Sequence, residues 1–160
     1  MRGLDRVLRG EGFGKVPAIA GTLACFDVAT RTLVSNWPTA PAQSPHGIVL
    51  IPEADAIAIA GGNGKLVLMS QADGKILSVA DIPLRVDEIA YDRETHHVYC
   101  ASGLGKIAIF SVENARLAPL AEITSASGAR SIAVDPRNHS IWIAYMNAEG
   151  SFIQNFEFVK

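Results

Sequence analysis

The stretch IAYDRETHHVYCA, residues 89–101, contains two short apolar runs separated by a polar segment. Two other stretches have the same arrangement, IVLIPEADAIAIA at residues 48–60 and IAVDPRNHSIWIA at residues 132–144. In each stretch the second apolar run begins nine positions after the first. Short runs of Ile, Val and Ala joined by turn-forming residues are typical of two β-strands in a hairpin.

These hairpins recur at a regular distance along the chain. Ile48 and Ile89 are 41 positions apart, and Ile89 and Ile132 are 43 positions apart. A third strand is expected at residues 64–68 and again at residues 105–109, and a fourth follows a polar turn at residues 75–79. Residues 23–26 and 31–34 match these third and fourth strands in a preceding unit. Because helical periodicity is not seen, the sequence predicts an all-β protein of four-stranded repeats.

Four-stranded repeats of this length, arranged around an axis, are the signature of a β-propeller blade. The first run of each unit is nearly all apolar, so we expect it to be the innermost strand, covered on both faces. The whole chain supplies about 14 strands, or about three and a half blades, whereas rings normally have 4–8. This count includes a first strand at residues 16–20. A β-sandwich is the alternative, although its repeats would be less regular.

We treat residues 1–160 as a single, partial propeller domain in which residues 1–20 match the repeat poorly. Hydrophobic residues make up 49% of the chain and charged residues 19%, the balance of a packed globular protein. The net charge of -2, without a basic cluster, argues against a nucleic-acid partner. No apolar run approaches the length of about 18 residues that spans a bilayer, and no signal peptide is recognised. We therefore expect no membrane insertion, and a cytoplasmic location for the chain as given.

The side chains that most often bind metals do not form a metal-binding pattern. Cys25 and Cys100 both lie in apolar alternating runs and are expected to be buried, unbonded thiols. His96 and His139 share one position of the repeat, but that position is a hairpin turn in two different blades. We therefore predict no metal site and no cofactor.

Four stretches together resemble the YVTN-repeat β-propellers, which share the fold of the quinoprotein amine dehydrogenase β-chain. They are WPTAP at residues 37–41, GNGKLVL at 62–68, VDEIAYD at 86–92 and GARSIAVDP at 128–136. The match covers about residues 22–160 and resembles the C-terminal half of a seven-bladed ring. Known members are mostly exported bacterial proteins, so the resemblance implies a periplasmic location if this chain is a fragment of such a member.

Candidate binding residues lie two positions before the aligned isoleucines: His46, Asp87 and Arg130. In a propeller the loop that enters each innermost strand opens onto one face, around the axis. We expect these side chains, with Arg85 and Glu88 on the same rim, to converge where a small polar ligand could bind. The other interpretation is that they form hydrogen bonds and ion pairs between blades.

The sequence favours a non-enzymatic binding or scaffold protein that contacts a protein or a small polar ligand through its rim loops. The alternative is an enzyme or enzyme subunit of the quinoprotein-dehydrogenase-like or lyase-like propeller kind, although no set of catalytic residues is recognised. An incomplete ring leaves strand edges and apolar blade faces uncovered. We therefore expect the chain either to close on itself as a small ring or to self-associate, with the blade that contains residues 151–159 near the contact.

Overall fold

The computed structural model describes residues 6–9 and 21–157. These residues form four antiparallel sheets, which we call blades one to four, and one 3-10 turn at Pro52–Ala54. In that part of the chain no helix is long and apolar enough to cross a membrane. Blade one contains β1 (Arg6–Arg9), β2 (Thr22–Asp27) and β3 (Thr32–Pro38), and blade two contains β4 (Pro45–Ile51), β5 (Ala56–Gly61), β6 (Lys65–Ser70) and β7 (Ile76–Asp81). Blade three contains β8 (Val86–Asp92), β9 (His97–Ser102), β10 (Lys106–Glu113) and β11 (Arg116–Thr124). Blade four contains β12 (Ala129–Val134), β13 (Ile141–Asn147) and β14 (Gly150–Phe156).

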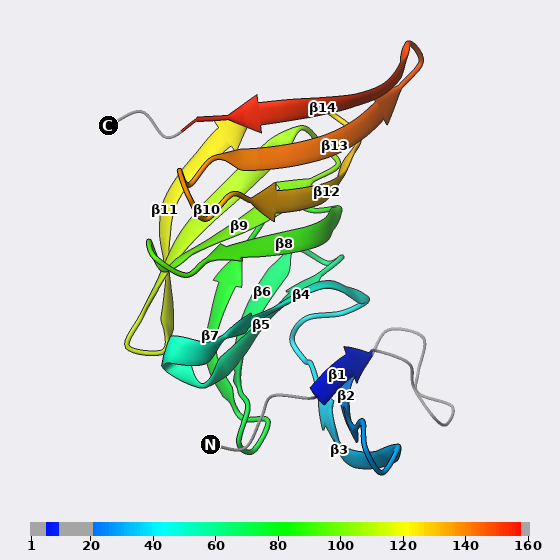
Figure 1. Ribbon diagram of the computed structural model, residues 1–160, viewed down its shortest axis with the longest axis vertical. Coiled ribbons are helices and arrows are strands. Elements are labelled where there is room, and N and C mark those ends of the chain that lie inside the picture. The colour runs from blue at the N-terminus through cyan, green and yellow to red at the C-terminus, as the bar shows by residue number, and fades with distance from the viewer. Residues whose placement is uncertain (1–5, 10–20, 158–160) are drawn as a thin grey trace.

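The blades follow one another along an arc, from β1–β3 at one end of the molecule to β12–β14 at the other (Figure 1). Within each blade the strands lie in chain order, and the innermost strands β4, β8 and β12 lie side by side. The predicted equivalence of the three isoleucines is confirmed by the register of these strands. Each pairs with the corresponding residue of the second strand: Ile48 with Ile59, Ile89 with Cys100 and Ile132 with Ile143.

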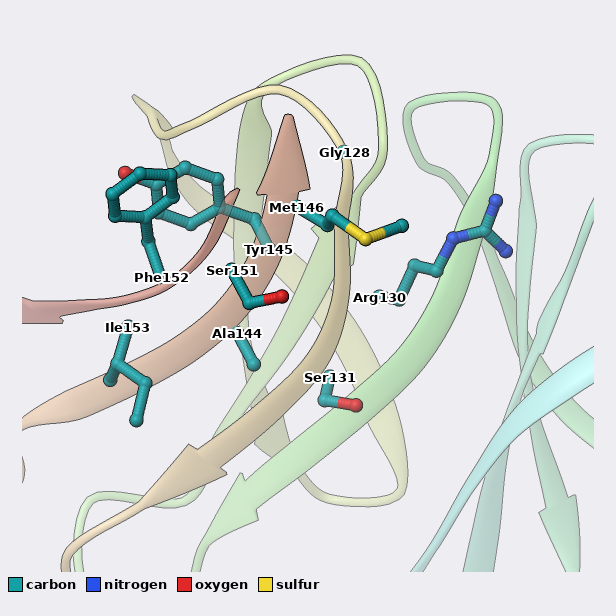
Figure 2. A pocket seen from close by; sticks show the side chains of 9 residues that line it. All are labelled: Gly128, Arg130, Ser131, Ala144, Tyr145, Met146, Ser151, Phe152 and Ile153. Atoms are coloured by element: carbon teal, nitrogen blue, oxygen red, sulfur yellow. The ribbon is translucent and has the colours of Figure 1, made fainter. Parts of the chain in front are cut away.

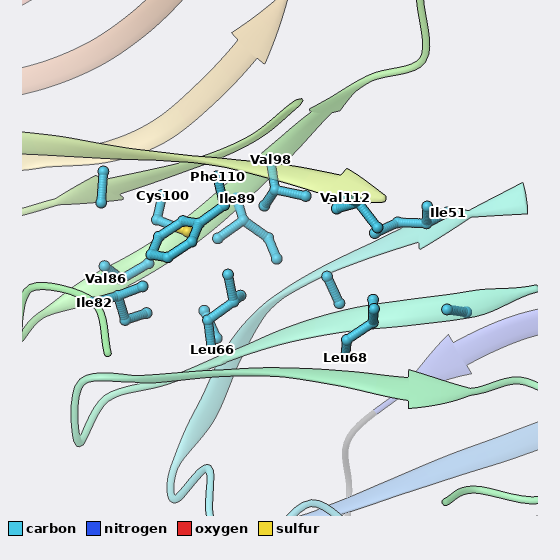
Figure 3. Close-up of a cluster of buried hydrophobic side chains, with 14 residues drawn as sticks. Ile51, Leu66, Leu68, Ile82, Val86, Ile89, Val98, Cys100, Phe110 and Val112 are labelled. Atoms are coloured by element: carbon cyan, nitrogen blue, oxygen red, sulfur yellow. The ribbon is translucent and has the colours of Figure 1, made fainter. Parts of the chain in front are cut away.

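The largest apolar core lies between blades two and three (Figure 3). Strand β5 shows how the sequence builds this layer, because all six of its residues are buried. Ala58 and Ala60 face blade three, whereas Ile57 and Ile59 face blade one. This alternation of small and large side chains lets both neighbouring blades approach one strand, since strand residues point alternately to opposite faces.

Two smaller cores join the remaining blades. Blade one packs on blade two through Leu23 and Trp37, and blade three packs on blade four through Tyr99 and Ile143. Trp37 is therefore a packing residue, whereas Trp142 is 45% exposed on the outer face of blade four. That face has no neighbouring blade among the described residues, which explains the exposure.

Both cysteines are buried and unbonded, as the sequence predicts. Cys25 lies in β2 of blade one and Cys100 in β9 of blade three. Burial raises the pKa of the Cys100 thiol, so this thiol is held in its protonated form. The first strand expected at residues 16–20 lies outside the described residues. Strand β1, which the sequence did not predict, pairs with β2 instead.

The outer strands of blades one, two and three share an irregularity. In each of β3, β7 and β11 one extra residue interrupts the pairing with the preceding strand. The extra residues are Val34, Leu77 and Leu120, spaced 43 positions apart, and all three are exposed. A β-bulge of this kind bends an edge strand and discourages further pairing. Strand β14, the last of blade four, pairs with β13 without any interruption.

Candidate functional site

A second set of β-bulges lies at the start of the innermost strands. The pairing between β4 and β5 skips His46, that between β8 and β9 skips Asp87, and that between β12 and β13 skips Arg130. The three rim residues predicted from the repeat are therefore the extra residues of three equivalent bulges. Bulges re-aim side chains and often lie beside binding sites, so the position suits a rim that contacts a ligand.

The backbone just before each bulge takes an unusual conformation at the same position. Ser44, Arg85 and Gly128, each two residues before a bulge, have φ of 47°, 61° and 85°. Two of these turns are tied down by hydrogen bonds, from Gly62 N to Ser44 O and from Gly103 N to Arg85 O. Positive φ in residues other than glycine is uncommon, and it persists where surrounding contacts define the loop.

The rim joins blade three to blade four through polar contacts. Arg130 Nη1 lies 3.4 Å from Asp87 Oδ2, and Glu88 Oε2 accepts a hydrogen bond of 3.1 Å from Ile132 N. The structure thus brings together Asp87 and Arg130, with Glu88 beside them. The side chains of His46 and Arg85 are exposed, and neither has a hydrogen-bond or ion-pair partner among the described residues.

The innermost strands also approach each other closely at this rim. A Cβ atom on Gly47 would lie only 2.9 Å from Ile89 N and 3.2 Å from Glu88 Cα. Glycine at this position therefore lets β4 lie against the backbone of β8. This contact brings the bulges at His46 and Asp87 onto neighbouring strands of one rim.

Arg130 also borders a hollow of about 560 Å³ on the outer face of blade four (Figure 2). The hollow is mostly apolar, with Tyr145 and Phe152 stacked at 5.3 Å between ring centroids. The guanidinium of Arg130 points away from this aromatic pair (Figure 2). The rim and the hollow are therefore adjacent surfaces of different character, one polar and one apolar.

The opposite ends of the innermost strands carry a polar cluster that sequence reasoning missed. Asp92 is 2% exposed, and its Oδ2 lies 2.7 Å from Nδ1 of His139 on the next blade. Burial raises the pKa of Asp92, but hydrogen bonds from His139 and from the Glu94 and Thr95 backbone hold the pKa below its ordinary value. The one signal in the sequence is the repeat position that His139 shares with His96, which the repeat places in hairpin turns.

Tyr91 and its neighbours extend this cluster to blade two. Its hydroxyl lies 3.2 Å from Glu53 Oε2 and 3.1 Å from His96 Nδ1, and Glu53 also pairs with Arg93. Burial and the Glu53 carboxylate raise the pKa of Tyr91 to about 12. His96 and His139 have different partners. In the part of the chain described, no three His, Cys, Asp or Glu side chains are placed to hold a metal ion.

No family model matches this sequence, and no curated protein matches it either. Similarity appears among solved structures. Hydrazine synthase of Kuenenia stuttgartiensis superposes with a TM-score of 0.74 at 9% identity, over 88% of this chain and 43% of that chain. A chain of the mitotic checkpoint complex superposes with a TM-score of 0.73 at 13% identity, over 88% of this chain and 46% of that chain.

Both of these structures are β-propeller proteins, and the chain therefore has a β-propeller fold. It spans less than half the length of either neighbour. At this level of identity the similarity establishes the fold alone. One neighbour is an enzyme and the other belongs to a protein complex, so neither decides what this chain does.

Proposed function

We propose that this chain is a non-enzymatic binding propeller that contacts a small polar ligand through the rim formed by the innermost-strand bulges. The observation that carries the proposal is the repetition of one bulge, at His46, Asp87 and Arg130, on three neighbouring strands. A bulge that served only local packing would not need to bring a polar side chain to the rim in three successive blades. The three residues are of different types. A structural repeat would keep one residue type at this position, whereas a surface that binds a single ligand needs a different contact from each blade.

The charges of the rim favour an anionic ligand. Asp87 faces Arg130, and the Glu88 carboxylate accepts from the backbone of β12, so both acidic groups already have partners. The side chains of His46 and Arg85 are exposed and have no partner in the part of the chain described, which leaves an imidazole and a guanidinium available to a ligand. Because a guanidinium binds planar carboxylates and phosphates through paired hydrogen bonds, we propose a ligand that carries such a group.

The test is an NMR titration of the full chain with two probes, malonate and inorganic phosphate. We expect saturable shifts for the backbone amides of residues 44, 46, 47, 85–88 and 128–131, and we expect Arg85→Gln to weaken binding at least tenfold. The matched control is Arg137→Gln, an exposed arginine in the hairpin between β12 and β13, which should leave binding within twofold. Shifts that do not saturate, or equal losses in both variants, would overturn the proposal.

Membership of the YVTN-repeat family is part of the proposal, and the positions of the motif stretches support it. Residues 86–92 form the innermost strand β8, and residues 62–68 form a hairpin turn and β6. Residues 128–136 begin in the rim loop at Gly128, which has a positive φ, and include the innermost strand β12. If the family assignment holds, a periplasmic location follows for a fragment of an exported member, since the known members are mostly exported bacterial proteins.

A further inference from the structure

The rim of blade three carries two exposed leucines at places that are polar in the neighbouring blades. Leu84, in the loop that enters β8, is 55% exposed, and Leu104, in the turn between β9 and β10, is 49% exposed. The repeat has polar side chains at both places elsewhere: Gln43 and Asn63 in blade two, and Ser127 and Asn147 in blade four. Single exposed leucines are ordinary on a protein surface, but two that replace polar residues at one end of one blade indicate a contact surface.

The backbone of this turn does not require leucine. The corresponding turns of blades two and three have the same shape, with Gly64 and Gly105 at φ of 78° and 82°. In blade two the turn is fastened by the side chain of Asn63, which accepts a hydrogen bond of 3.0 Å from Gln43 N and donates one of 2.9 Å to Pro41 O. Asparagine is therefore compatible with the turn, and the leucine of blade three needs another explanation.

In blade three a serine performs the task that the asparagine side chain performs in blade two. Ser102 is fully buried, and its hydroxyl donates a hydrogen bond of 2.6 Å to Leu84 O and accepts one of 3.1 Å from Leu104 N. This single hydroxyl holds the backbones of both leucines close together. Because the serine fastens the loop and the turn, the two leucine side chains have no part in fastening them and are left exposed to solvent.

A guanidinium lies within the same patch. Arg85 directly follows Leu84, and its Nε lies 3.9 Å from the position that a Cβ atom on Gly103 would take, next to Leu104. The side chain of Leu84 extends over the turn of blade two, where its Cδ2 lies 3.1 Å from the position of a Cβ atom on Gly64. Arg85 has no hydrogen-bond or ion-pair partner among the described residues. The patch therefore combines one unpaired positive charge with two apolar side chains.

We propose that Leu84, Arg85 and Leu104 together bind a small carboxylic acid that carries an aliphatic chain. The inference rests on the proposed anion-binding function of the rim and specifies the rest of the ligand. The carboxylate would pair with the Arg85 guanidinium, and the chain would cover the two leucines. Each methylene group of the ligand that leaves water favours binding, whereas a purely polar ligand would leave both leucines exposed.

The test is an NMR titration of the full chain with acetate, hexanoate and malonate. We expect hexanoate to shift the amides of residues 84–87 and 103–105 and to bind at least tenfold more tightly than acetate. Leu104→Asn and Leu84→Gln each introduce the residue that blade two has at the same place. Each should weaken hexanoate binding at least fivefold and leave malonate binding within twofold. The matched control is Leu33→Asn, because Leu33 in β3 is 50% exposed and distant in the repeat from the rim; it should leave the binding of both acids within twofold.

The outcomes separate this inference from the proposed function of the rim. Equal affinity for hexanoate and acetate, or unchanged hexanoate binding in both leucine variants, would overturn the inference, while malonate binding would leave the rim function standing. If malonate does not bind either, both fail. Hexanoate binding that Arg85→Gln leaves unchanged would also overturn the inference, because the carboxylate would then have no part in recognition.

Discussion

Blades two and three differ from blade four although all are built from the same repeat. Strands β5 and β6 of blade two are almost wholly buried, because a neighbouring blade packs on each face. In blade four only one face is covered, and β14 has no buried residue. The burial of a strand therefore depends on whether a neighbouring blade covers its face, and not on the strand alone. A repeat protein of this kind is stabilised through its interfaces.

The edges of the blades show the same contrast. Where a blade ends on its fourth strand, the bulges at Val34, Leu77 and Leu120 bend that strand and discourage pairing with a further strand. Where blade four ends on its third strand, the edge is regular and uncharged. The repeat thus protects only the strand that normally ends a blade. Four experiments test the difference between these regions.

Truncating an apolar side chain of the third strand in each of the two regions should give the largest difference. Leu68 is fully buried between blades two and three, whereas Ile153 of β14 is 72% exposed. We expect Leu68→Ala to lower the free energy of unfolding by about 2–5 kcal/mol. Ile153→Ala should lower it by less than about 0.5 kcal/mol. Urea unfolding measures both, and similar losses would show that the outer face of blade four is covered in solution.

The close approach of β4 and β8 predicts the next largest effect. Gly47→Ala would place a Cβ atom 2.9 Å from Ile89 N, so the two innermost strands must separate. We expect a loss of about 1–3 kcal/mol in the free energy of unfolding. The matched control is Gly62→Ala, whose Cβ would lie 3.5 Å from its nearest neighbour, Ser44 O. Equal stability of the two variants in thermal unfolding would contradict the contact between blades.

The Asp92–His139 contact predicts a smaller effect that depends on pH. Because Asp92 is buried and accepts several hydrogen bonds, Asp92→Asn should cost about 1–3 kcal/mol at neutral pH. Hydrogen bonding from His139 and the Glu94 and Thr95 backbone, which outweighs the effect of burial, lowers the folded-state pKa of Asp92 from 3.8. Its contribution is therefore complete above about pH 3.8 and is lost as the pH falls through the folded-state pKa.

Urea unfolding of both proteins from pH 7 to pH 2 measures this difference. The curves of wild type and Asp92→Asn should converge at low pH. A difference that stays constant over the whole range would show that the carboxylate charge is not what stabilises the contact. Asp135→Asn, at the equivalent position of blade four, is the comparison within one hairpin: hydrogen bonding from Arg137 lowers the pKa of Asp135 to about 2, so its curve should also converge with wild type at low pH, although no contact between blades is removed.

The rim ion pair should give the smallest effect. Arg130 and Asp87 lie 3.4 Å apart with side-chain exposures of 75% and 35%, and water screens such pairs. A double-mutant cycle with Arg130→Gln and Asp87→Asn should yield a coupling free energy below about 1 kcal/mol. Coupling of about 2 kcal/mol or more would mean that the rim, rather than the apolar core, holds blade four in place.

The sequence predicted the β-propeller fold and the equivalent isoleucines because both follow from a repeat of 41 to 43 positions. It also located the bulged residues His46, Asp87 and Arg130, although it did not predict the bulges. Whether these residues bind a ligand remains a prediction. The number of blades on the arc was also predicted, as two four-stranded and two three-stranded sheets give three and a half.

Other features depend on contacts that no local pattern encodes. The hydrogen bond between Asp92 and His139 joins residues 47 positions apart on two blades. Trp142 has the sequence environment of a packing residue, yet no blade covers its face in the part of the chain described. Strand β1 was missed because it lies in a segment without the apolar alternation of the repeat.

The polar cluster at the His139 end also has a consequence for motion. Contacts between Glu53, Tyr91 and His96, and between Asp92 and His139, link blades two, three and four at one end of the innermost strands. At the other end the loop that leads into β12 donates two hydrogen bonds to Gly103 O of blade three, from Gly128 N and Ser127 Oγ, beside the ion pair between Asp87 and Arg130. Polar contacts therefore hold blades three and four together at both ends of the innermost strands. Changes in the angle between these two blades should be resisted at the rim as well as at the His139 end.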